Sequence, residues 1–211
     1  SSVSNARLFD EFCKIFLNGM AEKNFNKLVS FGLNKYLVST NLNGCEFSNQ
    51  LIIEALRNTD NRIKNNQSVT PGFLIAALLW PQLIKKSLKG NEINLKKFFR
   101  SMDSILRNQQ KITAIPRKFH TYIKDIWVLQ LKLHSRIGRQ PYKTLKHPRF
   151  RAAYDFLLVR EKAAAKTKDL GFWWTEFQKN NEDLKKKLIN DLKKNNLEES
   201  SKIFGFSKEL R

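Results

Sequence analysis

The feature that most constrains the fold of this chain is a segment with two opposed helical stripes, between Pro116 and Gly138. Proline is tolerated at the first position of a helix and glycine commonly ends one, so we expect a helix from about Pro116 to Ile137. At about 100° per residue, one face carries its apolar side chains and one amide: Phe119, Tyr122, Ile123, Ile126, Leu129, Gln130 and Leu133. The opposite face is basic, with Arg117, Lys118, Lys124, Lys132 and Arg136. The segment therefore predicts a helix that packs on a core along one side and presents positive charge along the other.

Helical spacing of apolar residues recurs along the rest of the chain, and no alternating strand of useful length is present. Thr70-Pro71 is a helix start signal, a cap followed by a first-turn proline, ahead of a buried helix in which Pro81 introduces a kink or an end. At 211 residues the chain is long enough to bury a sizeable core. We expect an all-α fold, a multi-helix body with a packed basic helical module. Further apolar stripes support it: Leu8, Phe9, Phe12 and Phe16; Leu51, Ile52, Ala55 and Leu56; Leu95, Phe98, Phe99, Met102 and Leu106.

The charge of the chain indicates a polyanionic partner. Its 39 basic and 19 acidic residues give a net charge of +20. Residues 1–110 hold 15 basic and 8 acidic residues, whereas residues 111–211 hold 24 and 11, so the excess rises from +7 to +13. Nucleic acid or an anionic membrane surface fits such a balance. The longest apolar run, Phe73 to Trp80, is too short to span a bilayer, so we expect no stable membrane insertion. With only Cys13 and Cys45, a reducing cytoplasm is the expected location.

The positive charge continues beyond the first helix into a second one that opens at Pro148. Between Lys111 and Arg151 the only acid is Asp125. A solvated face is the alternative interpretation of a basic stripe, and the continuation through the turn favours nucleic-acid binding instead. The candidate RNA-binding residues are Arg117, Lys118, Lys124, Lys132, Arg136, Arg139, Lys143, Lys146, Arg149 and Arg151.

Two aromatic residues in this segment are candidates for stacking an unpaired base, Tyr142 and Trp127. Trp127 stands at the edge of the apolar stripe, so a place in the core is its alternative and favoured interpretation. His147, before Pro148, is expected to lie next to a helix cap, with a phosphate contact as the alternative. His120 and His134 do not stand at metal-ligand spacings either, and we predict no metal site.

Catalytic signals are missing from the chain. The glycines form no phosphate-binding loop, and no Asp-x-Asp pair supplies the carboxylates that a two-metal nucleotidyl transfer requires. We therefore predict no catalytic residues and no cofactor in this chain. Asp60 is expected to pair with Arg62, and Asp125 with a basic neighbour.

Several motifs resemble the C-terminal region of bacterial poly(A) polymerase. The longest is HPRFRAAYD, from His147 to Asp155, preceded by Gly138-Arg139 and by Asp125-Ile126-Trp127-x-Leu129-Gln130. The resemblance covers about residues 1–180. Four more segments agree in the same order: Arg7 to Glu11, Asn58 to Ile63, Pro71 to Trp80, and Trp173 to Gln178.

The resemblance implies a class II nucleotidyltransferase in which a catalytic α/β head adds AMP from ATP to RNA 3′ ends, a polyadenylation reaction. A neck, a helical body and a basic RNA-holding part follow that head. This chain holds no such head, and its first residue is not Met, so we expect a fragment of a longer protein that is inactive alone. ATP and Mg²⁺ would belong to the parent protein. Its partners would be single-stranded RNA 3′ regions and the upstream head, with little sequence preference.

We expect three parts along the chain. Residues 1–110 form the helical body, residues 111–180 the basic, arginine-rich RNA-binding module, and residues 181–211 a lysine-rich helix and tail that is partly disordered. Three other functions remain open. They are the tail of a tRNA nucleotidyltransferase of the CCA-adding type, a stand-alone non-catalytic adapter for RNA or DNA in which residues 139–151 are the turn of a helix-turn-helix, and a membrane-surface role.

Overall fold

The computed structural model describes residues 4–39, 46–90, 92–163, 167 and 169–194. Of these residues, 76% are helical, so the predicted all-α class is confirmed. The hairpin of β1 and β2 pairs Leu88 with Ile93 and Lys89 with Glu92. In the described ranges the elements are α1 (Asn5–Phe16), α2 (Ala21–Ser30), the 3₁₀ helix η1 (Asn34–Tyr36), α3 (Glu46–Lys64), α4 (Pro71–Ser87), β1 (Leu88–Lys89), β2 (Glu92–Ile93), α5 (Leu95–Ile112), α6 (Arg117–Lys132), α7 (Gln140–Leu145), α8 (Phe150–Lys162), α9 (Leu170–Lys179) and α10 (Glu182–Lys194).

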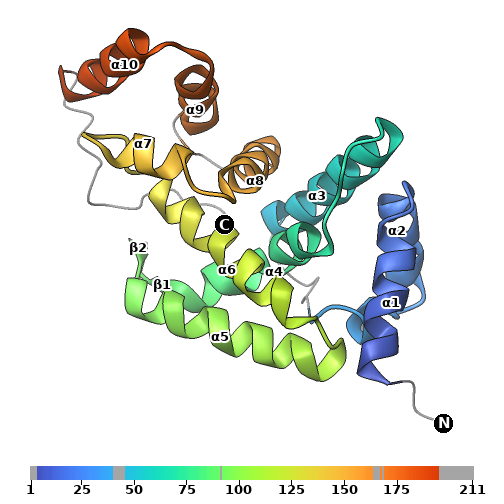
Figure 1. The fold of residues 1–211 in the computed structure, drawn as a ribbon. Helices are drawn as coiled ribbons and strands as arrows, with labels where there is room; N and C mark the ends of the chain where they lie inside the picture. The colour runs from blue at the N-terminus through green and yellow to red at the C-terminus, as the bar shows by residue number, and fades with distance from the viewer. Residues whose placement is uncertain (1–3, 40–45, 91, 164–166, 168, 195–211) are drawn as a thin grey trace.

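Helix α4 is the centre of the fold and packs against α3, α5 and α6 (Figure 1). It begins at Pro71 as predicted, and it runs through Pro81 to Ser87, so this proline does not end it. A side chain at Gly72 would place its Cβ 2.8 Å from a ring carbon of Tyr122 and 3.1 Å from one of Phe119. Glycine is therefore needed for the close approach of α6 to the start of α4.

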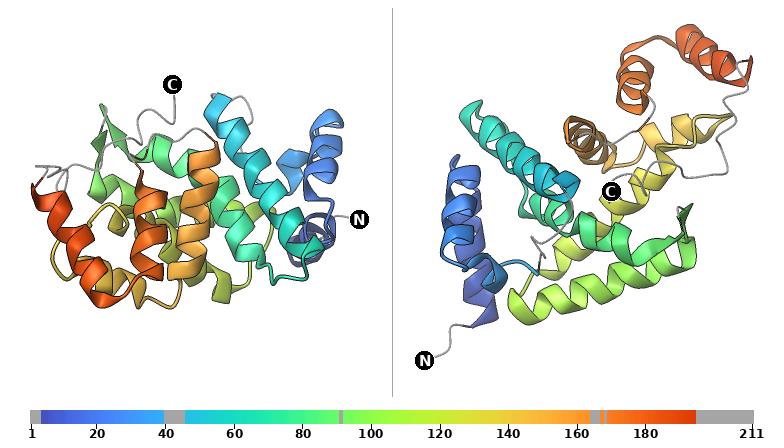
Figure 2. Two further views of the ribbon diagram at one scale, coloured as in Figure 1. Left: turned by 90° about the horizontal axis from the view of Figure 1, so that it is seen from above. Right: turned by 180° about the vertical axis from the view of Figure 1, so that it is seen from behind.

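The buried apolar residues form two clusters that share α6 and α8. The first surrounds α4, where the ring of Trp80 lies 5.4 Å from that of Phe156 and 6.4 Å from that of Phe98. The second joins α8 and α9 to the end of α6, with Trp173 and Trp174 inside it. Because α6 and α8 contribute to both clusters, the helices around the first cluster and those around the second are packed together. Figure 2 shows this arrangement from above and from behind. The proposed division at about residue 110 stays a prediction.

Helix α6 is shorter than the sequence predicts, since it ends at Lys132 and the chain turns through residues 133–139 before α7. The indole N–H of Trp174 donates a hydrogen bond to the carbonyl oxygen of Leu133, 2.9 Å away. A contact from α9 thus occupies a carbonyl at the point where the helix ends. The predicted terminator, Gly138, has φ +56° and lies in the following turn.

The lysine-rich segment after α9 forms a helix, α10, as expected. Ile189 is buried against the second cluster, with Leu188 and Leu192 packed beside it, whereas Leu184 is 45% exposed. The remainder of the expected tail, residues 195–211, lies outside the described residues.

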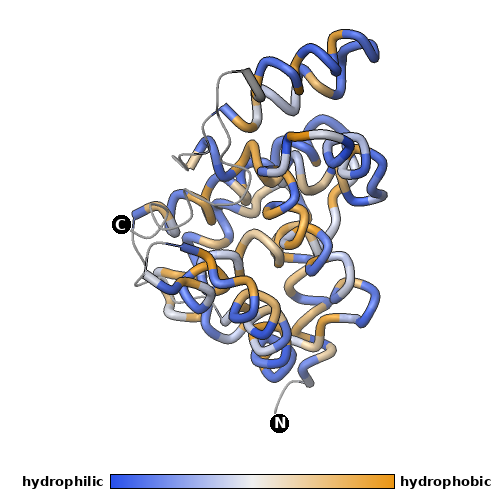
Figure 3. Tube along the Cα trace, turned by 90° about the vertical axis from the view of Figure 1, so that its left-hand side faces the viewer, coloured by the Kyte–Doolittle hydropathy of each residue, from blue (hydrophilic) through white to orange (hydrophobic). Residues whose placement is uncertain are grey.

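Hydropathy along the chain follows this packing, with apolar segments turned inward and polar segments on the outer turns (Figure 3). In the described ranges, no helix combines the length and the apolar character needed to cross a lipid bilayer. Four exposed apolar side chains lie close together in the sequence, from the end of α2 to η1, and we call them the α2–η1 patch: Val29, Phe31, Leu33 and Tyr36.

Candidate nucleic-acid interface

The basic stripe of α6 contains exposed cations and one cation that pairs with an acid of the protein. Arg117 and Lys118 are exposed in its first turn, and Lys132 is exposed at its end. Lys124 instead faces α5, where its Nζ lies 2.5 Å from Oδ1 of Asp103. Its charge is therefore partly compensated within the protein.

Beyond α6 the basic residues continue around the turn to α8. Arg139, Lys143 and Lys146 are exposed on and beside α7. The guanidinium of Arg149 lies over the ring of Tyr122, 4.9 Å from its centroid, in a cation–π contact that links the start of α8 to α6. Arg136 contacts Trp173 in the same way, at 5.6 Å.

Four of these cations line two separate hollows. Lys132 and Lys143 line a hollow of about 390 Å³ between α6 and α7. Arg149 and Arg151 line another of about 210 Å³, together with residues of α3 and α4. His147 belongs to the first hollow and Pro148 to the second, so the turn before α8 lies between them.

The two aromatic candidates differ in exposure. Trp127 is 0% exposed, and its indole N–H donates to the carbonyl oxygen of Ala76 at 2.9 Å. Base stacking by Trp127 is therefore excluded, and its favoured place in the core is confirmed. Tyr142 is half-buried, with its ring 5.3 Å from that of Phe177, and burial together with Glu182 raises the pKa of its phenol. Tyr142 stays a prediction as a stacking residue.

The three histidines have structural contacts. Nδ1 of His147 accepts a hydrogen bond at 3.1 Å from the backbone N–H of Arg149, the N-cap residue of α8, so His147 is a neighbour of the cap. Burial, with the nearby charges of Arg160 and Arg136, lowers the pKa of His134 to about 3. Within the described ranges, no group of three His, Cys, Asp or Glu side chains could hold a metal ion.

The predicted pairing of Asp60 with Arg62 is wrong. The carboxylate of Asp60 accepts hydrogen bonds from the backbone N–H groups of Ala21, at 2.6 Å, and Glu22, at 3.1 Å, and so holds the first turn of α2. Residues two apart on a helix do not face each other, and this rule could have excluded the pairing.

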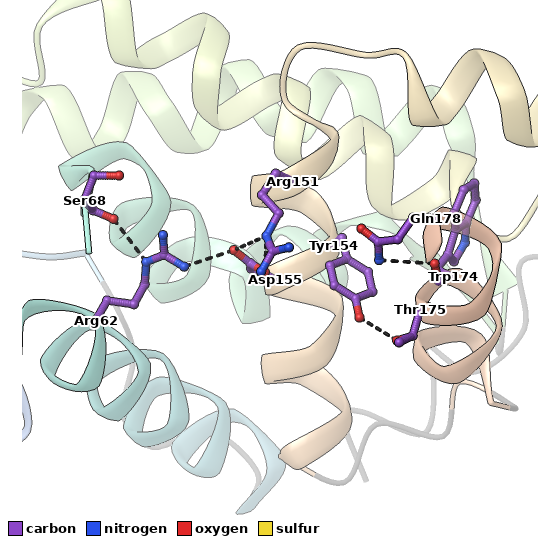
Figure 4. A network of polar contacts seen from close by, with 8 residues as sticks. All are labelled: Arg62, Ser68, Arg151, Tyr154, Asp155, Trp174, Thr175 and Gln178. Atoms are coloured by element: carbon purple, nitrogen blue, oxygen red, sulfur yellow. Dashed lines mark hydrogen bonds and ion pairs between the residues drawn. The ribbon is translucent and has the colours of Figure 1, made fainter. Parts of the chain in front are cut away.

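Sequence reasoning missed Arg62 as a member of the basic surface. Its Nη1 lies 3.2 Å from Oδ2 of Asp155 on α8, and its Nε donates to the carbonyl oxygen of Ser68 at 3.1 Å (Figure 4). Arg151 contacts the same carboxylate, with Nε 3.0 Å from Oδ1. Two arginines from distant parts of the chain thus meet at one acid.

A second missed residue is Arg160, which is 1% exposed within the core. Its Nη1 donates to Oε1 of Gln130 at 2.9 Å, and its guanidinium lies 4.8 Å from the ring centroid of Trp80. Gln130 in turn donates to the carbonyl oxygen of Ala153. Sequence spacing placed Gln130 on the core face, but it gave no sign that this amide holds a buried arginine.

Comparison with known proteins agrees with the resemblance seen in the motifs. Residues 91–203 match the family described as polymerase A arginine-rich C-terminus, and residues 1–40 match the family described as probable RNA and SrmB-binding site of polymerase A. The first match continues well past the expected limit at about residue 180, so the lysine-rich helix α10 belongs to the family region.

Curated relatives support the same assignment. Poly(A) polymerase I of Salmonella typhimurium and that of Escherichia coli O157:H7 are each 34% identical over 203 residues, which cover 91% of this chain and 44% of the relative. The Haemophilus influenzae protein of the same name is 33% identical over 200 residues. The chain thus spans less than half the length of these relatives, and it belongs to the polymerase A arginine-rich C-terminus family.

Proposed function

We propose that this chain is the RNA-holding C-terminal part of a poly(A) polymerase. It binds the single-stranded 3′ region of an RNA and presents it to a nucleotidyltransferase head in another part of the protein, which adds AMP from ATP. ATP and Mg²⁺ act at that head. The chain alone is inactive in nucleotide addition.

The observation that carries this proposal is the exposed positive charge between α6 and α8. Seven cations are exposed there and make no ion pair within the described ranges: Arg117, Lys118, Lys132, Arg139, Lys143, Lys146 and Arg149. Charges that the protein does not compensate are free to neutralise phosphates, and the release of condensed counterions then drives binding. Phosphate contacts position a strand without reading its sequence, so this surface tolerates many RNAs.

A charge-reversal experiment tests the proposal. The triple variant Arg117→Glu, Lys132→Glu, Lys143→Glu should bind unstructured RNA much more weakly, and the slope of log affinity against log salt should fall by about one per lost phosphate contact. The matched control reverses three exposed charges elsewhere, Lys85→Glu, Lys86→Glu and Arg107→Glu. If both triple variants lose the same affinity, overall charge explains the binding and this surface is not the interface.

Competition experiments separate this function from its rivals. A tRNA nucleotidyltransferase tail would prefer tRNA to unstructured RNA, and a helix-turn-helix adapter would prefer duplex DNA. We expect unstructured RNA to displace a labelled oligoribonucleotide better than either. Liposome flotation at physiological salt addresses the membrane alternative, where we expect no binding.

A protein contact at the α2–η1 patch is a second candidate function. The patch lies within residues 1–40, which match the family described as a probable binding site for RNA and SrmB. Phe31 is 74% exposed and Tyr36 57% exposed. Large apolar side chains gathered at a surface indicate a partner. Phe31→Asp should abolish capture of purified SrmB while leaving RNA affinity unchanged.

A further inference from the structure

Two motifs from distant parts of the sequence meet at one place on the surface. Asn58 to Ile63 lies on α3, and His147 to Asp155 leads into α8. They are joined where Arg62 and Arg151 both contact Asp155, as Figure 4 shows. The Asp155 side chain is only 13% exposed, so water competes weakly with these contacts and the carboxylate can fix the direction of both guanidinium groups.

A hollow lies on each side of this junction, and we call the two together the α3–α8 groove. The hollow of about 210 Å³ extends toward the starts of α4 and α8 and is lined by Thr70, Tyr122 and Arg149. The other, of about 260 Å³, extends along α3 and α8. Both are lined by the same four residues at their junction: Asn58, Arg62, Arg151 and Asp155. Each is smaller than the roughly 300–1,000 Å³ typical of a pocket for a whole small molecule, so each suits one part of a larger ligand.

The two ends of the groove differ in chemistry. At one end the guanidinium of Arg149 lies over the ring of Tyr122, which gives a flat cationic platform beside an aromatic one. At the other end the lining is rich in amides, from Asn61, Asn65 and Gln67. Guanidinium planes and aromatic rings stack on unpaired bases, and amide side chains hydrogen-bond to base edges.

The junction between the hollows keeps unmatched positive charge. One carboxylate, that of Asp155, serves two arginines, so one positive charge remains there. A guanidinium has five N–H donors, and the contacts of Arg62 use only its Nε and Nη1 within the described ranges. Its remaining donors suit a phosphate, which guanidinium groups bind with paired hydrogen bonds.

We propose that the α3–α8 groove binds one dinucleotide step of unpaired RNA. The phosphate between the two nucleotides binds Arg62 and Arg151 at the junction. One base lies against the Arg149–Tyr122 platform, and the other faces the amides of the second hollow. Asp155 is a positioning residue that aims both arginines. The inference rests on the proposed function, because it takes RNA as the ligand. It adds a local preference for base identity that the exposed cations between α6 and α8 do not provide.

The first test removes one charge inside the groove and one outside it, using the 211-residue chain and a labelled unstructured oligoribonucleotide. Arg151→Gln should lower affinity roughly tenfold, because a charge-assisted phosphate contact is lost. Lys64→Gln is the matched control, since Lys64 is exposed on α3 two residues from Arg62 and lines neither hollow. It should change affinity by less than about twofold. Equal losses in the two variants would overturn the groove proposal.

The second test uses the sign of the effect at Asp155. Asp155→Asn makes the groove more positive, so nonspecific attraction alone would strengthen RNA binding. If Asp155 aims Arg62 and Arg151, the same variant weakens binding, by roughly tenfold for the pair of phosphate contacts. Tighter binding by Asp155→Asn overturns its positioning role, and thermal melting checks that the variant is folded. If Asp155→Asn does not fold, the Arg151→Gln comparison decides, because Arg151 is an exposed residue whose loss leaves the core intact.

Competition identifies the ligand and separates the two proposals. The dinucleotide pApA should displace the labelled RNA at lower concentration than AMP or inorganic phosphate does, because only it fills both hollows. Equal competition by AMP would mean that the groove takes a free nucleotide, which overturns the RNA step. If the unaltered chain binds no RNA, the proposed function fails. If it binds RNA and the groove variants bind equally well, only the groove proposal fails.

Discussion

Helix α3 contributes to two arginine clusters with opposite ratios of cations to acids. Arg57 lies between two carboxylates, with Nη2 2.9 Å from Oε1 of Glu22 and Nη1 3.0 Å from Oε1 of Glu54. At the α3–α8 groove the ratio is reversed, since among the described residues Asp155 is the one acid that pairs with Arg62 and Arg151. The first cluster can be satisfied within the protein, whereas the second retains positive charge. This difference distinguishes an arginine that joins two helices from arginines that are available to an anion.

The pKa of Arg57 reflects its surroundings. Hydrogen bonds to Glu22 and then to Glu54 raise it above its ordinary value. A guanidinium that already contacts two carboxylates has fewer N–H donors left for a phosphate. Counting acids around each arginine therefore tells more about binding than counting arginines along the sequence does.

The largest expected effect concerns the buried imidazole of His134, just beyond the end of α6 and beside two arginines. Burial and the charges of Arg160 and Arg136 lower the pKa of His134 to about 3, below its ordinary 6.5. The folded protein therefore keeps this imidazole neutral, while the unfolded chain takes up a proton below about pH 6.5. The stability that this histidine contributes is present above pH 6.5 and is lost progressively as the pH falls toward 3, by on the order of 4 kcal/mol.

Urea unfolding measured across this pH range checks the expectation. His134→Gln should lose less stability between pH 6.5 and pH 3 than the unaltered chain does, because it has no imidazole to protonate on unfolding. His120→Gln leaves His134 in place and should follow the unaltered chain. Parallel curves for all three proteins would show that burial does not keep the imidazole of His134 neutral in the folded protein.

The next largest effect tests whether the contacts between α2 and α3 stabilise the fold. Asp60 is 8% exposed and accepts hydrogen bonds from two backbone N–H groups at the start of α2. Asp60→Ala leaves these donors without a partner and should lower the free energy of unfolding by about 1–3 kcal/mol. Asp103→Asn, which breaks the exposed pair with Lys124, is the control and should cost at most about 1 kcal/mol. RNA affinity should be unchanged by Asp60→Ala at temperatures where the variant is folded.

A smaller effect comes from making the groove resemble the Arg57 cluster. Asn61→Asp adds a carboxylate to a groove lining that already contains Asp155 and Glu54, so the lining would hold more negative charge. We expect RNA affinity to fall roughly tenfold and the salt slope to fall with it. Asn108→Asp adds the same charge on an exposed turn of α5 and should have a much weaker effect, because exposed charges act only over about a Debye length of ~10 Å. Equal effects of the two variants would mean that the position of the acid is irrelevant.

The sequence was sufficient for the features that depend on local spacing. Helical periodicity predicted the all-α fold, Thr70-Pro71 predicted the start of α4, and His147 was correctly predicted to lie beside a helix cap. Each of these depends on residues within a few positions of one another. The end of α6 was missed because the indole of Trp174, which bonds to Leu133, comes from 41 residues further along the chain.

The contacts that define the groove were beyond sequence reasoning for the same cause. Arg62 and Asp155 are 93 residues apart, and no periodicity connects α3 to α8. The ten cations proposed from the sequence lie on or near α6, α7 and α8, and their contacts with other helices decide which of them are ion-paired. Lys124 and Arg151 are ion-paired, and only the packing of helices reveals this.

The smallest expected effect is the converse substitution, in which the Arg57 cluster is made to resemble the groove. Glu22→Gln leaves Arg57 with Glu54 as its one ionised partner in the part of the chain that the structure describes, while the backbone N–H of residue 22 still bonds to Asp60. Surface ion pairs contribute little to stability, so the melting temperature should hardly change. RNA affinity should rise by less than about twofold, because Arg57 lines neither hollow of the groove. If Glu22→Gln strengthens RNA binding as much as Asn61→Asp weakens it, the ratio of cations to acids acts wherever it occurs. The α3–α8 groove would then have no advantage over any other positive surface of the molecule.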